Sequence, residues 1–242
     1  MFQIFFREVN SFLNSLIGYL VIGMFLICIG LLTWVFPSSS VLEYGYANMD
    51  TLFSLGPYIL IFLLSAVTMR SFAEEKRLRT LEWLMTKPLT DWDLIFGKFL
   101  ASNLLAIFSL AFTIVYYFSL YYLGDPVGNI DSPGVLGSYV GMVLLSAVFC
   151  AIGILASSLS NNQIVSFLFS IFFCTTFYIG FDFLAQLFEN GSIVILIRQW
   201  GILYHYESLS RGLIDSRDIV YFLTLIGVFL LFSKVALNKR TW

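Results

Sequence analysis

The sequence has few charged residues and almost none of the side chains that usually perform catalysis or bind metals. Only 12% of its 242 residues are charged, whereas 59% are hydrophobic. A single histidine makes an HExxH zinc motif impossible, and the three cysteines show no CxxC spacing. GxxxxGK[ST] and GxSxG are also missing, because Gly97-Lys98 is followed by Phe99 and lacks the upstream glycine. We therefore expect no catalytic residue, no metal site and no cofactor bound by this chain.

The hydrophobic residues are grouped in runs long enough to cross a bilayer. A helix of ~20 apolar residues spans the ~30 Å hydrocarbon core. Six such runs predict an all-α membrane protein with one transmembrane domain covering residues 1–242. The spans are expected at about residues 16–36, 52–72, 99–123, 135–159, 164–188 and 219–237. Basic residues are neither in excess nor arranged in a stripe, so nothing indicates a nucleic-acid partner.

The positive charges predict how the spans are oriented. The first fifteen residues alternate apolar and polar positions at helical spacing, which indicates an amphipathic helix in the membrane interface. The loops after spans one and three hold no Lys or Arg, whereas the loop after span two and both termini do. Because positive residues favour the cytoplasmic side, we expect both termini there, in the inner membrane. The exceptions are Arg198, Arg211 and Arg217.

The most charged segment, Arg70–Lys98, separates spans two and three. It carries six of the 13 Lys and Arg residues. Apolar positions at helical spacing predict a helix over Glu74–Thr86, with Glu75 and Arg79 as an i,i+4 pair. Lys87-Pro88 should end this helix, because the residue before a proline is pushed out of the α region.

A second helix should follow, because Thr90 and Asp93 have capping-box spacing. Two interpretations of the whole segment compete. It is either a solvated amphipathic connector that touches only lipid headgroups, or a docking surface whose movement passes into spans two and three. Its continuity with both spans and its mixture of charged residues with Trp83 and Trp92 favour docking.

The same segment resembles the signature of the ABC-2 type transporter permeases. The stretch EEKRLRTLEWLMTKPLTDWDLIFGK carries acidic and basic residues before a T-L-E-x-L-x-x-x-P pattern, followed by G-K. A second match is SRGLIDSRDIVYFL at Ser210–Leu223. The likeness extends over essentially the whole chain and is strongest to the gliding-motility permease subunit (GldF type) of Bacteroidetes. Arg79 departs from the pattern, because the broader family more often has Gly before the Thr.

The resemblance implies a fold like that of ABC-2 (type V) exporters. This fold would have an N-terminal interfacial helix, a cytoplasmic coupling helix between spans two and three, and re-entrant helices between spans five and six. It also implies an ABC ATPase dimer that holds ATP and Mg, and a second transmembrane subunit. That subunit would be another copy or a gliding-type auxiliary subunit with a periplasmic domain.

Specific residues follow from this resemblance. Glu75, Thr80, Glu82 and Pro88 match the coupling motif, and Arg79 and Trp83 complete the candidate ATPase-coupling surface. The expected function is that of a permease subunit of an ABC-type export complex, with gliding motility as one setting. The alternative is a membrane anchor that transmits ATPase work to a periplasmic partner while nothing crosses the bilayer.

The segment between spans five and six contains an apolar run too short to span the membrane. We interpret it as a re-entrant pair, with a loop lying on the outer surface as the alternative. Asp182, Arg198 and Trp200 are the candidate path or gate residues. His205 is expected to be structural or at the surface, since a relay would need a buried acid beside it.

Gly137 and Gly141 form a GxxxG motif in span four. Small residues at this spacing let two helices approach closely. The motif fits helix packing within the subunit better than a seam between two subunits, although both remain open at this point.

Overall fold

The computed structural model is all-helical over the part of the chain it describes, residues 1–45, 47–81, 90–189 and 191–238. The helices are α1 (Phe2–Leu13), α2 (Leu16–Trp34), α3 (Val41–Tyr44), α4 (Asp50–Thr68), α5 (Ala73–Arg77), α7 (Asp91–Phe112), α8 (Ile114–Leu123), α9 (Ser132–Leu159), α10 (Gln163–Thr175), the π-helical turn η1 (Thr176–Gly180), α11 (Phe181–Ala185), α12 (Gly191–Arg198), α13 (Ile202–Ser210) and α14 (Ser216–Asn238). The predicted all-α membrane fold is confirmed.

Five helical segments of the described chain are long and apolar enough to cross a membrane. They are Asp50–Arg77, Asp91–Leu123, Ser132–Leu159, Gln163–Ala185 and Ser216–Asn238. A sixth span results if the bent pair Phe2–Leu13 and Gly18–Trp34, which meet at 67°, is counted as one. The number of spans is therefore five or six, in agreement with the six expected.

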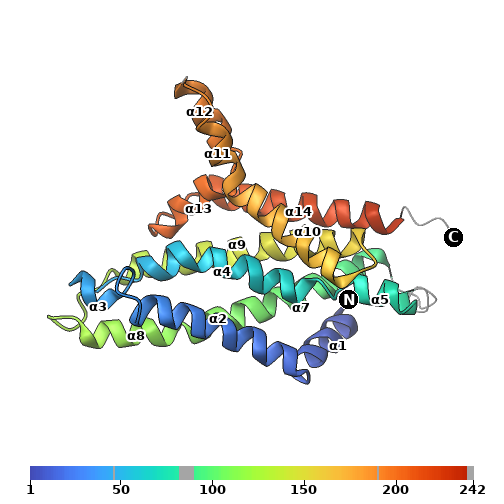
Figure 1. Ribbon diagram of the computed structural model, residues 1–242, viewed down its shortest axis with the longest axis horizontal. Helices are drawn as coiled ribbons and strands as arrows, with labels where there is room; N and C mark the ends of the chain where they lie inside the picture. Colours follow the sequence, from blue (N-terminus) through green and yellow to red (C-terminus); the bar gives the residue numbers. More distant parts are fainter. Residues whose placement is uncertain (46, 82–89, 190, 239–242) are drawn as a thin grey trace.

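Helix α9 lies at the centre of the bundle, packed against α4, α10, α13 and α14 (Figure 1). Its middle, from Leu145 to Ile154, is entirely buried. Helix α4 approaches it so closely that a Cβ at Gly153 would lie 2.0 Å from the Thr68 hydroxyl oxygen. A glycine is required there, because any side chain would push the two spans apart.

The GxxxG motif of α9 packs inside the subunit. A Cβ at Gly137 would lie 2.7 Å from the Cα of Gly212, and one at Gly141 would lie 2.7 Å from the Cβ of Leu209. The motif therefore receives α13 and the turn that follows it, as the packing interpretation predicted.

Helix α9 starts three residues before the expected span at residue 135. Its N-cap is Asp131, because the Asp131 carboxylate accepts a hydrogen bond from the backbone N–H of Gly134 at 3.1 Å. The Ser132 hydroxyl lies 2.6 Å from the hydroxyl of Tyr117 on α8. Helix α7 starts as predicted, with a capping box between Thr90 and Asp93.

The predicted continuous helix over Glu74–Thr86 is wrong. Helix α5 ends at Arg77, and the next two backbone N–H groups, of Leu78 and Arg79, bond back to Glu74 and Lys76. Arg79 then adopts a left-handed conformation with φ 56°. A left-handed residue cannot continue a right-handed helix, so the chain turns at this point.

The fifth span also ends earlier than expected, at Ala185 rather than Phe188. It contains the π-helical turn η1, after which α11 and α12 form an arm that projects from the bundle (Figure 1). No residue of α12 is buried. Helix α13 returns to the bundle and packs on α9 and α14.

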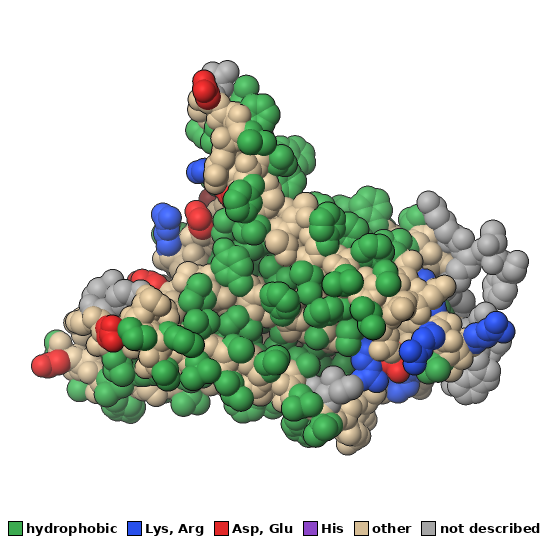
Figure 2. Space-filling view, in the orientation of Figure 1, with side chains coloured by type: hydrophobic (Ala, Val, Ile, Leu, Met, Phe, Trp, Pro, Cys, Tyr) green, Lys and Arg blue, Asp and Glu red, His purple; other side chains and the backbone are tan. Residues whose placement is uncertain are grey.

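Charged residues gather toward the two ends of the bundle. Most of the blue Lys and Arg side chains lie at the end that holds α1, α5 and the last turns of α14, together with some acidic residues, whereas the opposite end carries red Asp and Glu side chains and fewer blue ones (Figure 2). Green hydrophobic side chains cover the surface between them, as expected for helices that face lipid.

Candidate functional site

Four charged side chains from three helices meet at the basic end of the bundle, and we call them the ion cluster: Arg7 and Glu8 of α1, Glu75 of α5 and Lys98 of α7. The Lys98 ammonium lies 2.8 Å from a Glu75 oxygen and 3.0 Å from a Glu8 oxygen. Arg7 pairs with the same two carboxylates, at 2.9 Å and 2.7 Å. Two positive and two negative charges therefore balance within a few ångströms.

The centre of this ion cluster is shielded from water. The Lys98 side chain is only 2% exposed, and its ammonium lies 5.2 Å from the centre of the Phe72 ring. The two glutamates are 15% exposed. A buried charge is tolerated only when it is paired, and here Lys98 and Arg7 together give both carboxylates a positive partner.

Gly97 explains how α1 reaches Lys98. A Cβ at Gly97 would lie 2.9 Å from the Cγ2 of Ile4, so α1 lies directly on this turn of α7. The G-K pair of the family-like motif thus has two distinct tasks here. Gly97 admits α1, and Lys98 binds the carboxylates that α1 and α5 present.

The cluster changes the ionisation of Glu8. Burial by itself would raise the pKa of this carboxyl group, but the adjacent Lys98 and Arg7 outweigh burial and hold the pKa below its ordinary value. One oxygen of Glu75, Oε2, is buried and has no hydrogen-bond partner within the described residues. The cluster is therefore held by charge, and its hydrogen bonding is incomplete.

Helix α5 is also attached to the central helix. The Ser157 hydroxyl of α9 accepts hydrogen bonds from the backbone N–H groups of Phe72 and Ala73, at 2.9 Å and 3.0 Å. The same hydroxyl donates to the carbonyl of Met69. The Lys76 ammonium donates to the carbonyl of Ser158. The bend from α4 into α5 is thus fixed to α9 by side chains that span more than 80 residues of sequence.

The coupling residues expected from sequence divide into three groups. Arg79 and Thr80 are exposed just beyond α5, as a docking surface requires. Glu75 instead points inward to Lys98 and Arg7, so the expected Glu75–Arg79 ion pair is wrong. An ion pair between residues four apart does form nearby, between Arg70 and Glu74, at 2.9 Å. Glu82, Trp83 and Pro88 lie outside the described residues.

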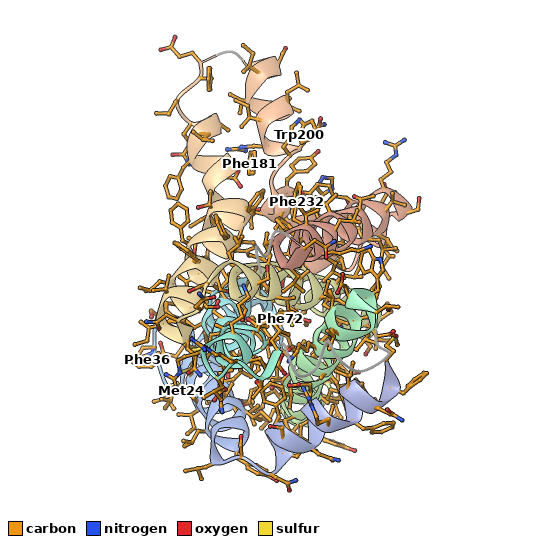
Figure 3. The ribbon with its side chains drawn as sticks, turned by 90° about the vertical axis from the view of Figure 1, so that its right-hand side faces the viewer. Met24, Phe36, Phe72, Phe181, Trp200 and Phe232 are labelled. Carbon is orange, nitrogen blue, oxygen red and sulfur yellow. The ribbon has the colours of Figure 1, made fainter. Side chains whose placement is uncertain are left out.

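The candidate path or gate residues are partly brought together. Asp182 of α11 and Arg198 of α12 form an ion pair at 3.2 Å at the base of the projecting arm. Trp200 follows, with its side chain 71% exposed and its carbonyl accepting a hydrogen bond from the Tyr221 hydroxyl at 2.7 Å. Figure 3 shows Trp200 close to Phe181, where the arm leaves the bundle.

A polar contact that the sequence analysis missed joins α13 to α14. The Nδ1 atom of His205 lies 2.7 Å from a carboxylate oxygen of Asp218, which is buried, and Nε2 lies 3.0 Å from the carbonyl of Gln199. Tyr221 stacks on the imidazole with its ring centre 3.9 Å away. Both ring nitrogens therefore lie within hydrogen-bonding distance of an oxygen atom. The sequence feature that could have indicated this contact is the single histidine, which lies 13 residues before an acidic residue at the start of a span.

No group of three or more His, Cys, Asp or Glu residues in the described part of the chain could hold a metal ion.

An all-helical chain with five or six apolar spans and a charged cluster at one end belongs to the class of multi-pass membrane proteins. The family model for ABC-2 family transporter proteins matches residues 40–241, so the chain belongs to the ABC-2 transporter family. Comparison with curated proteins finds no match. The chain is thus a permease subunit of an ABC exporter, a family whose members work with an ABC ATPase at a membrane.

Proposed function

We propose that this permease docks its ATPase on the surface around Arg79 and Thr80, and that the ion cluster carries the ATPase movement into the membrane. The observation that supports this role is the position of Lys98. It lies on the first turns of α7 and holds both α5, next to the docking surface, and α1. A displacement of α5 would therefore be transmitted to α7 directly through the ion pair between Glu75 and Lys98.

The orientation that goes with this proposal places α1, α5 and the end of α14 in the cytoplasm of a bacterial cell, with the chain in the inner membrane. Positive charge supports it. The exposed Arg77 and Arg79 and the half-exposed Arg7 lie at this end, where the positive-inside rule expects basic residues.

The complex that we propose contains an ATPase dimer below the membrane and a second transmembrane subunit beside this chain. ATP and Mg would be bound by the ATPase subunits. The second subunit would be another copy of this chain or an auxiliary subunit with a periplasmic domain. The likeness to gliding-motility permeases supports gliding as the setting in which the complex performs transport or mechanical work.

On the outer side, we assign the Asp182–Arg198 pair to a gate. It joins the two helices of the arm where they leave the bundle, and both partners are partly exposed, so water can reach the pair. Opening the arm would break one exposed ion pair, which costs only about 0–1 kcal/mol. This small cost suits a contact that has to open in every cycle.

The docking surface can be tested by charge reversal. Arg79→Glu and Glu82→Lys should each abolish co-purification of the ATPase from native membranes, because each reverses the sign of a charge on the proposed docking surface. Arg217→Glu is the matched control, since Arg217 is an exposed arginine at the opposite end of the bundle. Its complex should be recovered at the wild-type level.

Two other results would contradict the proposal. Normal ATPase recovery with both Arg79→Glu and Glu82→Lys would remove docking from this segment. Loss of the ATPase with Arg217→Glu alone would place docking at the other end of the molecule. Insertion and folding of each variant are checked by size-exclusion chromatography before the ATPase is measured.

A further inference from the structure

The turn that leads from the projecting arm back to the bundle is held by side chains of α13 and α14. Gln199 and Trp200 follow the last residue of α12, and α13 begins at Ile202. The Trp200 carbonyl accepts a hydrogen bond from the Tyr221 hydroxyl at 2.7 Å, and the Gln199 carbonyl lies 3.0 Å from Nε2 of His205. The imidazole and the tyrosine that stacks on it therefore fix the end of the arm.

The two contacts of the His205 imidazole require two protons. A backbone carbonyl cannot donate, so Nε2 must carry a proton to bond to Gln199. A second proton must lie between Nδ1 and the Asp218 carboxylate, 2.7 Å apart, whichever of the two groups carries it. A neutral imidazole beside an ionised carboxylate has only one proton to share between these contacts. The arrangement therefore contains one bound proton more than that neutral pair.

Two helix ends favour the placement of this proton on the imidazole. Asp218 lies in the first turn of α14, where the helix dipole stabilises a carboxylate. Gln199 directly follows α12, whose C-terminal end favours a positive charge. Asp218 is also buried, and His205 is its only ion-pair partner among the residues that the structure describes. An imidazolium that faces an ionised carboxylate satisfies all these conditions.

Other titratable groups on the elements around α13 lie in other contacts. Asp182 and Arg198 of the arm pair with each other at 3.2 Å. Glu207 lies two residues beyond His205, on another face of α13, and lines a pocket with Arg211. Further groups on these elements are the exposed Arg217 of α14 and the phenols, neutral near pH 7, of Tyr139, Tyr178, Tyr204 and Tyr221. Among these groups, the imidazole is the one whose charge ordinarily changes near neutral pH.

We propose that the His205–Asp218 pair is a proton-operated latch on the arm. When the imidazolium loses a proton, only one ring nitrogen can still donate. The remaining proton stays between the ring and Asp218, because a charged acceptor forms the stronger hydrogen bond. The bond to Gln199 is then lost, and two lone pairs face each other in its place. Loss of the proton thus releases the end of the arm and leaves α13 bonded to α14.

The latch is closed by acid. The latched state binds one proton that the released state lacks, so the ratio of latched to released molecules falls by up to about tenfold for each pH unit above about pH 6.5. In the proposed orientation the latch lies on the outer side, so an acidic exterior would hold the gate closed together with the Asp182–Arg198 pair. Only this consequence rests on the proposed function, because the latch itself requires no ATPase.

Hydrogen exchange of the full chain in lipid nanodiscs tests the latch. Exchange is followed by mass spectrometry at pH 6 and pH 8, with labelling times scaled to equal intrinsic exchange. Residues 191–210 of the wild type should exchange about five-fold or more faster at pH 8, whereas α7 should be unchanged. Because the chain has one histidine, NMR of isotope-labelled histidine reads the charge of this ring directly. The ring should be charged at pH 6 and neutral where exchange becomes fast.

Three variants distinguish the latch from ordinary packing. His205→Gln cannot titrate, so scaled exchange of the arm should be fast and equal at both pH values. His205→Arg carries a permanent cation with several donors, so exchange should be slow at both pH values, and this variant repeats the test if His205→Gln fails to fold. Tyr204→Phe is the matched control, because Tyr204 packs against the imidazole ring and makes neither of the two contacts. Its pH dependence should equal that of the wild type.

Three results would overturn the proposal. Equal scaled exchange of the wild-type arm at pH 6 and pH 8 would mean that no proton holds it. A pH dependence that persists in both His205 variants would belong to another group. An equal rise of exchange in α7 and in the arm would mean a general loosening of the bundle. These results are obtained without the ATPase, so a failure of the latch is distinguishable from a failure of the proposed docking or gating.

Discussion

Replacing Lys98 with methionine should destabilise the protein strongly, because it removes the buried cation that two largely buried carboxylates share. Methionine keeps the length and apolar stem of the lysine, so the packing against Phe72 is retained. What is lost is an ammonium 2.8 Å from Glu75 and 3.0 Å from Glu8, on a side chain that is 2% exposed. Breaking a buried ion pair by removing one partner costs about 3–5 kcal/mol. Arg7 remains but is 47% exposed, so it can compensate only in part.

The reasoning predicts a specific rescue. A triple variant that combines Lys98→Met with Glu8→Gln and Glu75→Gln removes the unpaired charges together with the cation. It should recover most of the lost stability, since replacing buried charges together costs far less than removing one partner, and the remaining Arg7 is 47% exposed. Arg77→Met is the control, because Arg77 is exposed and should change stability by no more than about 0.5 kcal/mol.

The assay is reversible unfolding in mixed micelles, followed by tryptophan fluorescence and repeated at two salt concentrations. The buried cluster should be nearly insensitive to salt, because screening acts mainly on exposed charges. The argument fails if Lys98→Met unfolds within about 0.5 kcal/mol of the wild type, or if the triple variant is no more stable than Lys98→Met alone.

Three further predictions follow from single contacts. Arg79→Gly should raise stability by about 1 kcal/mol in the same unfolding assay, because glycine adopts the left-handed conformation at φ 56° without strain; a loss of stability would contradict this. Asp218→Asn should lower the unfolding midpoint and increase hydrogen exchange in α13, because His205 loses its charged acceptor, and unchanged exchange would argue against the contact. Because the pKa of Glu8 is lowered, its stabilising effect should be complete above about pH 4.5 and be lost as the pH falls further. The difference in unfolding midpoint between wild type and Glu8→Gln, measured from pH 6 to well below pH 4.5, checks this, and a difference that grows on acidification would refute it.

The spans were predictable from sequence, because a bilayer requires apolar runs of a fixed length and leaves little freedom. The capping box at Thr90 and Asp93 was predictable for a similar reason, since it depends only on residues three apart. The breaks inside spans were not, because Thr113 between α7 and α8 and the turn η1 interrupt predominantly apolar runs that contain neither proline nor charge at the break.

The candidate site was predictable only as a segment. The family-like motif drew attention to Glu75 and Lys98, but it gave no indication that they bind each other across 23 residues or that Glu8 joins them across 90. Helical periodicity predicted an exposed Glu75–Arg79 pair, which depended on a straight helix. The left-handed Arg79 ended that helix, and the sequence hint of the turn was the resemblance, which led us to expect glycine at this position.

The attachment of α5 to Ser157 has a mechanical consequence. If α5 were attached only to the two spans next to it in sequence, a force on α5 would tilt those two spans and leave the other helices in place. Here the bend between α4 and α5 is fastened to α9, the helix around which α4, α10 and α14 are packed. Force applied at α5 would be shared at once by the spans packed around α9, so the subunit should rotate as one body instead of flexing at a hinge.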